Sequence, residues 1–290
     1  MLRRWSSSLV WGVLRLVEAT GAQVAVTASN EGRLAGVRLQ WRAKQPDAIQ
    51  GTIRTFEAWH QRFRFFIADD SDSIQRCHRR GRLYEEEELE IIARHFSGGT
   101  FVDVGANVGN HSIFAATVLG AERVIAFEPE PHAAHICEIN IALNGVQNLI
   151  VLHRIGLSDH AARAVPVLEE HNLGGTRLDI ADEGPIQLTL GDEVLSEEAV
   201  SFVKIDTEGH ELSVLAGLAA TIERCGPTLF VEVANANIDA FKAFCRSIGY
   251  DVAECFRRYD VCANFVALPL RQPPAGRKRR QAPDRPDPGR

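Results

Sequence analysis

Residues 101–111 read Phe-Val-Asp-Val-Gly-Ala-Asn-Val-Gly-Asn-His, and this stretch decides the fold class. An apolar run ends at Asp103, a turn containing Gly105 and Gly109 follows, and the next residues can begin a helix. A strand, a tight loop and a helix N-terminus in this order form the arrangement with which an α/β sheet seats a nucleotide-like cofactor. The two glycines permit backbone angles and a close approach that a β-carbon would block. The stretch therefore predicts a cofactor loop at the end of a buried strand.

The spacing within this loop indicates which kind of cofactor it holds. The pattern is Gly-x-Asn-x-Gly, with an acid two residues before the first glycine. Enzymes that bind dinucleotides usually show Gly-x-Gly-x-x-Gly instead. An acid ahead of the loop suits a positively charged ligand better than a pyrophosphate, and S-adenosylmethionine carries both a sulfonium and an ammonium group. We therefore expect S-adenosyl-L-methionine as the cofactor, bound by Asp103, Gly105, Asn107 and Gly109.

The composition is that of an ordinary globular protein, because 45% of the 290 residues are hydrophobic and 24% are charged. The net charge of −6 gives no global reason to expect a nucleic acid or an anionic membrane as a partner. The six cysteines form no Cys-x-x-Cys pair, so we expect free thiols in a cytoplasmic, reducing compartment and no metal site. The apolar stretch 9–14 is too short to span a bilayer, so we expect no transmembrane segment and no secretory signal.

Three regions differ in character along the chain. Residues 271–290 contain five prolines and seven Lys or Arg, which cannot bury enough apolar surface to offset the entropy of ordering. We expect a disordered basic tail there. Residues 97–270 form the expected main domain, which contains the cofactor loop, and residues 1–96 form an expected N-terminal extension and cap. Within that extension, residues 62–65 alternate between charged and aromatic side chains, as in a half-buried strand.

Strands alternate with helices from residue 100 onward. The expected strands are 100–104, 123–127, 149–154, 201–205 and 228–233, and the expected helices are 84–96, 110–119, 132–144, 211–218 and 238–248. Two further strands, 251–255 and 264–268, follow with no helix between them, which predicts an antiparallel hairpin strand at the end of the sheet. Alternation of this kind builds a mostly parallel sheet with helices on both faces. The predicted fold class is α/β, a Rossmann-like class I methyltransferase fold with a seven-stranded sheet.

Three residues beyond the glycine loop are expected to complete the cofactor site. Glu128 ends the second strand, where an acid can accept hydrogen bonds from both ribose hydroxyls. Ser158 and Asp159 follow the third strand, where the adenine ring lies in folds of this class. Because Ser and Asp are also common turn residues, an ordinary turn at 156–159 is an equal alternative.

A second motif, Val-Lys-Ile-Asp-Thr-Glu-Gly-His-Glu at 203–211, leaves the fourth strand. Ligands in open α/β sheets bind beyond the carboxyl ends of the strands, so these charged groups point to a site. We expect Asp206 to face the sulfonium, and Asp206, Glu208 and His210 to be the candidate catalytic residues. A structural histidine and acids that favour a helix N-terminus are the alternatives for His210 and Glu208.

Two further features concern the surroundings of this site. Glu232 lies inside an apolar strand and must be paired if it is buried. It can pair with Lys204 on the adjacent strand, which we favour slightly, or face the mouth of the substrate site. Residues 171–176 lie between the third and fourth strands, and we expect a flexible polar loop there that covers the site.

Taken together, residues of about 80–268 resemble the FkbM family of S-adenosylmethionine-dependent methyltransferases. The matching stretches are 101–109, Phe-Glu-Pro at 127–129, Gly-Leu-Ser-Asp at 156–159, 203–211, Pro-Thr-Leu-Phe-Val-Glu at 227–232, and Asn-Phe-Val-Ala at 264–267. The resemblance implies an O-methyltransferase that acts on a hydroxyl group of a sugar, a polyketide or another small-molecule or glycan acceptor. The family more often has a small residue where this chain has His210, so a role of His210 would be particular to this protein.

Two other classes of protein share parts of this pattern. A nicotinamide-dependent oxidoreductase would have the same fold and Glu128, but the glycine loop argues against it. A non-catalytic cofactor-binding protein would keep the sheet without turnover, which the acids at both strand ends disfavour. Methylation of nucleic acid is disfavoured further, since the part of the chain before the tail is acidic. The sequence does not indicate an oligomeric state.

Overall fold

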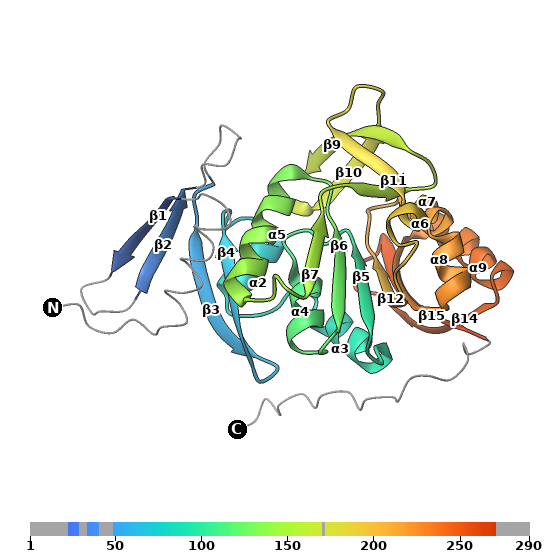
Figure 1. Cartoon of the computed structure of the whole chain (residues 1–290), viewed down its shortest axis with the longest axis horizontal. Coiled ribbons are helices and arrows are strands. Elements are labelled where there is room, and N and C mark those ends of the chain that lie inside the picture. The colour runs from blue at the N-terminus through green and yellow to red at the C-terminus, as the bar shows by residue number, and fades with distance from the viewer. Residues whose placement is uncertain (1–22, 29–33, 41–48, 170–171, 271–290) are drawn as a thin grey trace.

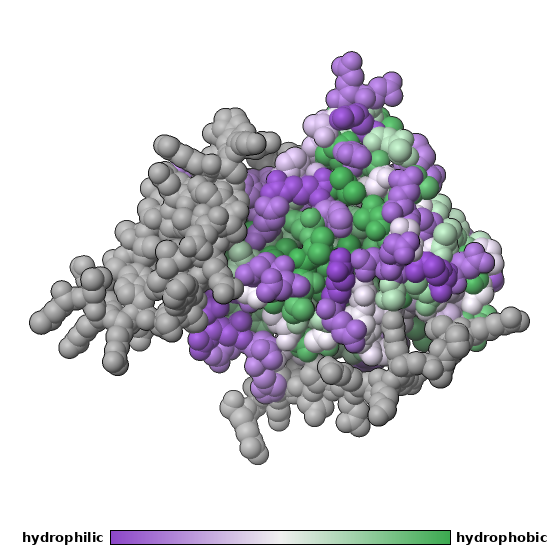
Figure 2. Space-filling model, viewed as in Figure 1, coloured by the Kyte–Doolittle hydropathy of each residue, from purple (hydrophilic) through white to green (hydrophobic). Residues whose placement is uncertain are grey.

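The structure is a computed structural model that describes residues 23–28, 34–40, 49–169 and 172–270 (Figure 1). The tail expected at 271–290 and the N-terminal stretch before residue 23 lie outside the described residues. Within the described part, none of the helices combines the length and the apolar character needed to cross a lipid bilayer. Figure 2 shows hydrophobic residues gathered near the centre of one face and hydrophilic residues bordering them.

The centre of the structure is a seven-stranded sheet with the order β14-β15-β13-β12-β5-β6-β7. Its strands are β5 (Thr100–Val104), β6 (Arg123–Phe127), β7 (Ile150–His153), β12 (Val200–Ile205), β13 (Thr228–Ala234), β14 (Tyr250–Phe256) and β15 (Cys262–Pro269). The strands β13, β12, β5, β6 and β7 are parallel, and β15 pairs antiparallel with both β13 and β14. This arrangement confirms the predicted class I methyltransferase fold, including its closing hairpin.

Helices cover both faces of this sheet (Figure 1). The helices are α3 (Glu86–His95), α4 (Asn110–Thr117), α5 (Pro131–Asn144), α7 (Glu211–Gly217), α8 (Ala219–Cys225) and α9 (Ile238–Ser247). Successive residues of a strand point to opposite faces, so each strand serves two cores. Phe101 packs in a core with α3, α4 and α5, whereas the next residue, Val102, packs with α7, α8 and α9. Because the strands are buried on both sides, they read as apolar runs in the sequence.

The described residues before α3 form two hairpins and a helix, and the second hairpin packs against the same core. They form the hairpin β1 (Gln23–Ala28) with β2 (Leu34–Gln40), the hairpin β3 (Thr52–Ala58) with β4 (Gln61–Ile67), and the helix α2 (Ser73–Arg79). Phe63 and Phe65 of β4 are fully buried in one core with Phe101. On α5, the amide oxygen of Asn140 accepts a hydrogen bond from the backbone N–H of Phe66 at 2.7 Å. The strand expected at 62–65 is therefore present as β4.

The segment between β7 and β12 contains a second sheet that the sequence pattern did not predict. It consists of β8 (Gly156–Ser158), β9 (Ala162–Glu169), β10 (Asn172–Ile180) and β11 (Ile186–Leu190), in the order β10-β9-β11-β8, and is followed by the short helix α6 (Gly191–Val194). The flexible loop expected at 171–176 is wrong as to its conformation, because its described residues 172–176 belong to β10. Its expected position at the site agrees with the structure, since Gly175 and Thr176 line the cavity described below. Three buried residues, Ala164, Ile186 and Leu188, give this sheet a small core of its own. Residues 156–158, where a turn was one alternative, are the strand β8.

Candidate functional site

A cavity of about 420 Å³ opens at the carboxyl ends of β5, β6, β12 and β13. The glycine loop and Glu128 line one part of it, and the acids at the ends of β12 and β13 line another. The segment before α3 and the loop between β14 and β15 also contribute. The cavity therefore lies where a parallel α/β sheet binds its ligands.

The glycine loop is held tightly against its neighbours. The backbone N–H groups of Gly105 and Ala106 each donate a hydrogen bond to the carbonyl of Phe127 at 3.0 Å. Gly105 has a φ of +79°, and a β-carbon on it would lie 1.8 Å from the carbonyl oxygen of Asp206. Gly105 and Asn107 line the cavity, whereas Gly109 precedes α4 and faces Cys137. Gly105 thus allows the loop and the end of β12 to touch.

We expect Gly105→Ala to lower the free energy of unfolding by about 3 kcal/mol or more, because it combines backbone strain with a backbone clash. Gly145→Ala is the matched control, since Gly145 has a φ of +70° and a β-carbon added to it would meet no neighbouring atom within 4 Å. The control variant is expected to lose only the strain of a left-handed residue, about 1–2 kcal/mol. Chemical denaturation of both variants measures the difference, and equal losses would contradict the role assigned to the close contact.

Glu128 is fixed at the end of β6 by two backbone donors. Its Oε2 accepts from the N–H of Asn107 at 2.7 Å, and its Oε1 accepts from the N–H of Glu130 at 2.8 Å. Each carboxylate oxygen keeps a second lone pair for a ligand. Burial raises the pKa of Glu128 to about 7, although the two N–H donors lower it in part. The carboxyl group is therefore oriented in advance and changes its charge near neutral pH.

His210 lies beside the residues expected at the adenine ring. Its Nε2 is 3.0 Å from the hydroxyl oxygen of Ser158, which in turn donates to Asp159 at 3.1 Å. Burial lowers the pKa of His210. His210 lines the cavity with Gly156 and Leu157, whereas Ser158 is fully buried behind the wall. The structure thus brings together three of the predicted site residues from β8 and the end of β12.

Three acids gather at the other end of the cavity. Carboxylate oxygens of Asp206, Glu208 and Glu232 lie within 4.8 Å of one another, close enough to share one cation. Burial, and next the Asp206 carboxylate, raises the pKa of Glu232 to about 8. Two of the predicted catalytic residues, Asp206 and Glu208, are therefore together, and Glu232 joins them in the lining of the cavity.

The buried Lys204 amine has different partners from the one favoured on the sequence. It lies 3.3 Å from a carboxylate oxygen of Asp103 and 3.5 Å from one of Asp206, and it donates to the carbonyl of Gly105 at 3.0 Å. Burial lowers the pKa of Lys204, but Asp103, Asp206 and a third acid outweigh this effect and raise it above the usual value. The preference for a Lys204–Glu232 pair is wrong, because two acids on nearer elements neutralise the amine.

Asp103 lies beneath the glycine loop. Its side chain is fully buried, it accepts a hydrogen bond from the hydroxyl of Ser112 at 2.6 Å, and it is absent from the residues that line the cavity. Asp103 is linked to the cavity only indirectly, through the ion pair with Lys204, whose amine also pairs with Asp206. Asp103 therefore fixes the base of the site, and its expected direct contact with the cofactor stays a prediction.

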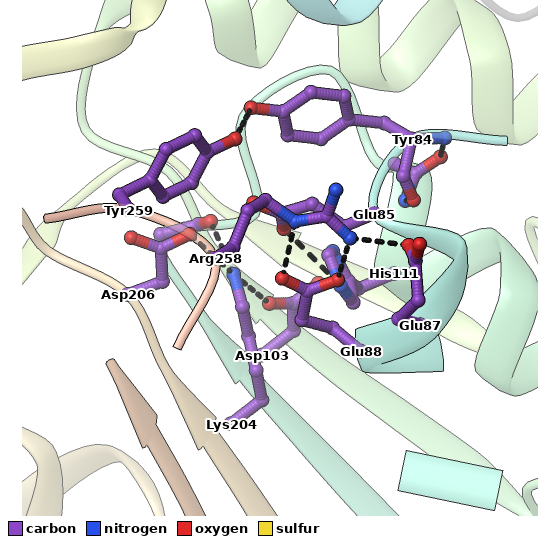
Figure 3. Close-up of polar contacts among 12 residues, drawn as sticks. Tyr84, Glu85, Glu87, Glu88, Asp103, His111, Lys204, Asp206, Arg258 and Tyr259 are labelled. Atoms are coloured by element: carbon purple, nitrogen blue, oxygen red, sulfur yellow. Dashed lines mark hydrogen bonds and ion pairs between the residues drawn. The ribbon is translucent and has the colours of Figure 1, made fainter. Parts of the chain in front are cut away.

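Tyr84, Glu85 and Tyr259 also line the cavity, although no sequence motif pointed to them. The hydroxyl groups of Tyr84 and Tyr259 are 2.9 Å apart (Figure 3). Arg258 lies next to Tyr259 and forms ion pairs of 2.5 Å with both Glu87 and Glu88 of α3. The acids before and in α3 were visible in the sequence only as helix-starting residues, and the loop 257–261 carries no motif.

A mostly parallel sheet of this order, with β15 antiparallel and a glycine loop at its carboxyl edge, is the class I methyltransferase fold. The chain belongs to the FkbM methyltransferase family, since the family model described as "Methyltransferase FkbM domain" matches residues 103–254. The match begins at Asp103, the acid before the glycine loop, and includes Glu128, the acids of 206–208 and Glu232.

Two curated relatives are also methyltransferases by name. The hexuronic acid methyltransferase AglP of Haloferax volcanii is 30% identical over 126 residues, which cover 42% of this chain and 50% of AglP. The methyltransferase sdnD of Sordaria araneosa is 27% identical over a match that covers 44% of this chain and 63% of sdnD. The chain thus spans between half and just under two thirds of the length of these relatives. A crystal structure of an FkbM methyltransferase from Methylobacillus flagellatus KT is 22% identical with a TM-score of 0.41, covering 58% of this chain and 44% of that one.

Proposed function

We propose that the protein transfers the methyl group of S-adenosylmethionine to a hydroxyl group of a sugar, a polyketide or another small-molecule or glycan acceptor. One observation carries this proposal: a single cavity joins a fixed carboxyl group beside the glycine loop to a group of acids at the end of β12 and β13. The fixed carboxyl group can accept hydrogen bonds from the ribose of the donor, and the group of acids can stabilise the positive charges of the donor. The name of the AglP relative, which specifies a hexuronic acid, supports a sugar-like acceptor.

The residues of the chain divide between the two ends of this cavity. Glu128 would accept hydrogen bonds from the ribose hydroxyls, and the wall at Gly156 and Leu157 would face the adenine ring. Asp206 and Glu208 would face the ammonium and sulfonium groups. The bound cofactor supplies an activated methyl group, and the protein contributes mainly by holding the acceptor oxygen in line with it. Because His210 is engaged with Ser158, we place it with the adenine side and assign the proton transfer to a carboxylate.

Calorimetry with purified protein tests the cofactor directly. We expect S-adenosylmethionine to bind with micromolar affinity and NADH to give no heat of binding. Transfer of a radiolabelled methyl group to a panel of sugars and polyketides would then identify the acceptor. Binding of NADH in place of S-adenosylmethionine would show a nicotinamide-dependent enzyme, and binding of neither would contradict the proposed function.

The affinity for S-adenosylhomocysteine is expected to fall with decreasing pH. The ionised form of Glu128 accepts from both ribose hydroxyls, and with a pKa of about 7 this form becomes scarce below neutrality. The affinity should therefore be about tenfold weaker at pH 6 than at pH 8. The test uses S-adenosylhomocysteine because it lacks the sulfonium charge of the donor. That charge would shift the pKa values of the other acids in the cavity and obscure the titration of Glu128. In Glu128→Gln, the slope over this range should fall to the part that Glu232, with a pKa of about 8, contributes through the ammonium group. An unchanged slope would contradict the assignment.

A further inference from the structure

Glu85 occupies a strained position at the wall of the cavity. It has left-handed backbone angles of φ 56° and ψ 50° and immediately precedes α3, and its side chain is only 10% exposed. Left-handed angles in a residue other than glycine are uncommon and often mark functional positions. Figure 3 shows Glu85 in the same group of side chains as Asp206 and Lys204. The backbone thus turns a buried carboxyl group toward the acidic end of the cavity.

The carboxyl group of Glu85 has only a weak partner in the described part of the chain. It contacts Nε2 of His111 at 3.8 Å, which is longer than a hydrogen bond. Burial lowers the pKa of His111 to about 3, so this imidazole is neutral and supplies no positive charge. A buried carboxyl group in such surroundings holds its proton until a cation approaches.

The groups around Glu85 come from every neighbouring element. They are Asp206 and Lys204 from β12 and its end, Glu232 from β13, Glu88 from α3, His111 from α4, Asp103 from β5, the adjacent Tyr84, and Arg258 and Tyr259 from the loop 257–261. Among these described residues, both cations have carboxylate partners of their own: Lys204 pairs with Asp103 and Asp206, and Arg258 pairs with Glu87 and Glu88. Burial, and next the Asp206 carboxylate, raises the pKa of Glu85 well above its usual range.

We propose that Glu85 is the proton acceptor of the methyl transfer and becomes a base only when the cationic donor occupies the cavity. This inference rests on the function proposed above. Arrival of the sulfonium charge stabilises the Glu85 carboxylate, which releases its proton to solvent. As the acceptor oxygen forms its bond to the methyl carbon, the carbon–sulfur bond breaks and its electron pair stays on sulfur. The hydroxyl proton moves to Glu85, and the neutral thioether product leaves the carboxyl group protonated, as it was before the donor bound.

The other candidate bases are engaged with neighbouring groups or exposed to solvent. Asp206 pairs with Lys204, and His210 lies against Ser158. Glu232 shares a hydrogen bond with the thiol of Cys262, and Glu208 is exposed to solvent. A general base needs a free lone pair and a pKa near the working pH. Glu85 has free lone pairs and a place in the cavity, and the charge of the donor would lower its raised pKa on binding.

Calorimetry at pH 7 in buffers of different ionisation enthalpy counts the protons released on binding. We expect wild-type protein to release about one proton more with S-adenosylmethionine than with S-adenosylhomocysteine. Glu85→Gln should abolish this difference while it binds S-adenosylhomocysteine normally, which also shows that the variant is folded. Glu85→Asp should restore part of the difference. Glu57→Gln is the control, because Glu57 is an exposed glutamate whose side chain is 76% accessible, and it should behave as wild type.

The outcomes separate this inference from the proposed function. A full proton difference in Glu85→Gln, or its loss in Glu232→Gln alone, would overturn the assignment to Glu85 while leaving the methyltransferase intact. Failure of the wild-type protein to bind either ligand would instead overturn the proposed function. With an acceptor from the methyl-transfer panel, kcat of Glu85→Gln should fall by about a hundredfold or more at unchanged KM for the donor. An unchanged kcat would also overturn the assignment.

Discussion

Glu128→Ala is expected to weaken the binding of S-adenosylmethionine by at least about a hundredfold, because it removes two charge-assisted hydrogen bonds to the ribose, each worth about 1.5–3 kcal/mol. The substitution also removes hydrogen bonds within the protein. The same carboxyl group accepts from the backbone N–H groups of Asn107 and Glu130, so its loss frees the glycine loop and the turn before α5. Isothermal titration calorimetry on the folded variant measures the change.

Two further variants make this result interpretable. Glu128→Gln keeps the shape of the side chain and one acceptor oxygen, so we expect an intermediate loss of about tenfold. Glu138→Ala removes a partly exposed glutamate of α5 that pairs with Arg154, outside the cavity lining, and should bind as wild type. A tenfold or smaller loss in Glu128→Ala would show that the ribose is held elsewhere.

Lys204→Met is expected to lower the free energy of unfolding by about 3–5 kcal/mol, since it leaves a buried carboxylate without its counter-charge. The side chains of Lys204 and Asp103 are 4% and 0% exposed, so water cannot replace the lost partner. Asp206, which is 29% exposed, can be solvated in part and adds less to the loss. Urea unfolding at constant pH and ionic strength measures the change.

The double variant Asp103→Asn/Lys204→Met tests the cause of this loss. Removing both charges also removes the unpaired carboxylate, so we expect the double variant to regain at least half of the stability lost by Lys204→Met. Asp103→Asn alone should be less harmful than Lys204→Met, because Lys204 then keeps Asp206 and the carbonyl of Gly105. A double variant as unstable as Lys204→Met would mean that packing around the lysine stem, and not charge, accounts for the loss.

Most of the main sheet could be predicted from the sequence, since strands such as β5 and β12 are buried on both faces and therefore stand out as apolar runs. The closing hairpin was recognisable because no helical pattern separates its two strands. The second sheet was not, because β9 contains a proline and β10 contains two glycines, and the order of β9 depends on its pairing with both β10 and β11. Such pairing leaves little trace in local sequence.

Those residues of the candidate site that directly follow a strand could be predicted from the sequence. Glu128 and Asp206 each come directly after a buried strand, so their place at the cavity followed from the fold. Glu85 gave no such signal, because its orientation depends on a left-handed backbone that its sequence neighbours do not require. Tyr259 is brought to Tyr84 from 175 residues away, a contact that only the folded chain reveals. The partner of Lys204 was misjudged because β12 has a strand on either side, with Asp103 on one and Glu232 on the other.

The contact between the loop 257–261 and α3 has a consequence for how specificity can change in this family. The end of the cavity that we propose for the donor is built from the sheet itself, whereas the opposite wall includes a surface loop held by Arg258 and Tyr259. Substitutions in such a loop do not alter the sheet, so the acceptor specificity can change while the proposed donor end stays the same. Exchange of the loop between relatives would nevertheless have to carry its anchors on α3 along with it. Under the proposed function, acceptor choice would thus be inherited as a pair of segments that lie far apart in the sequence.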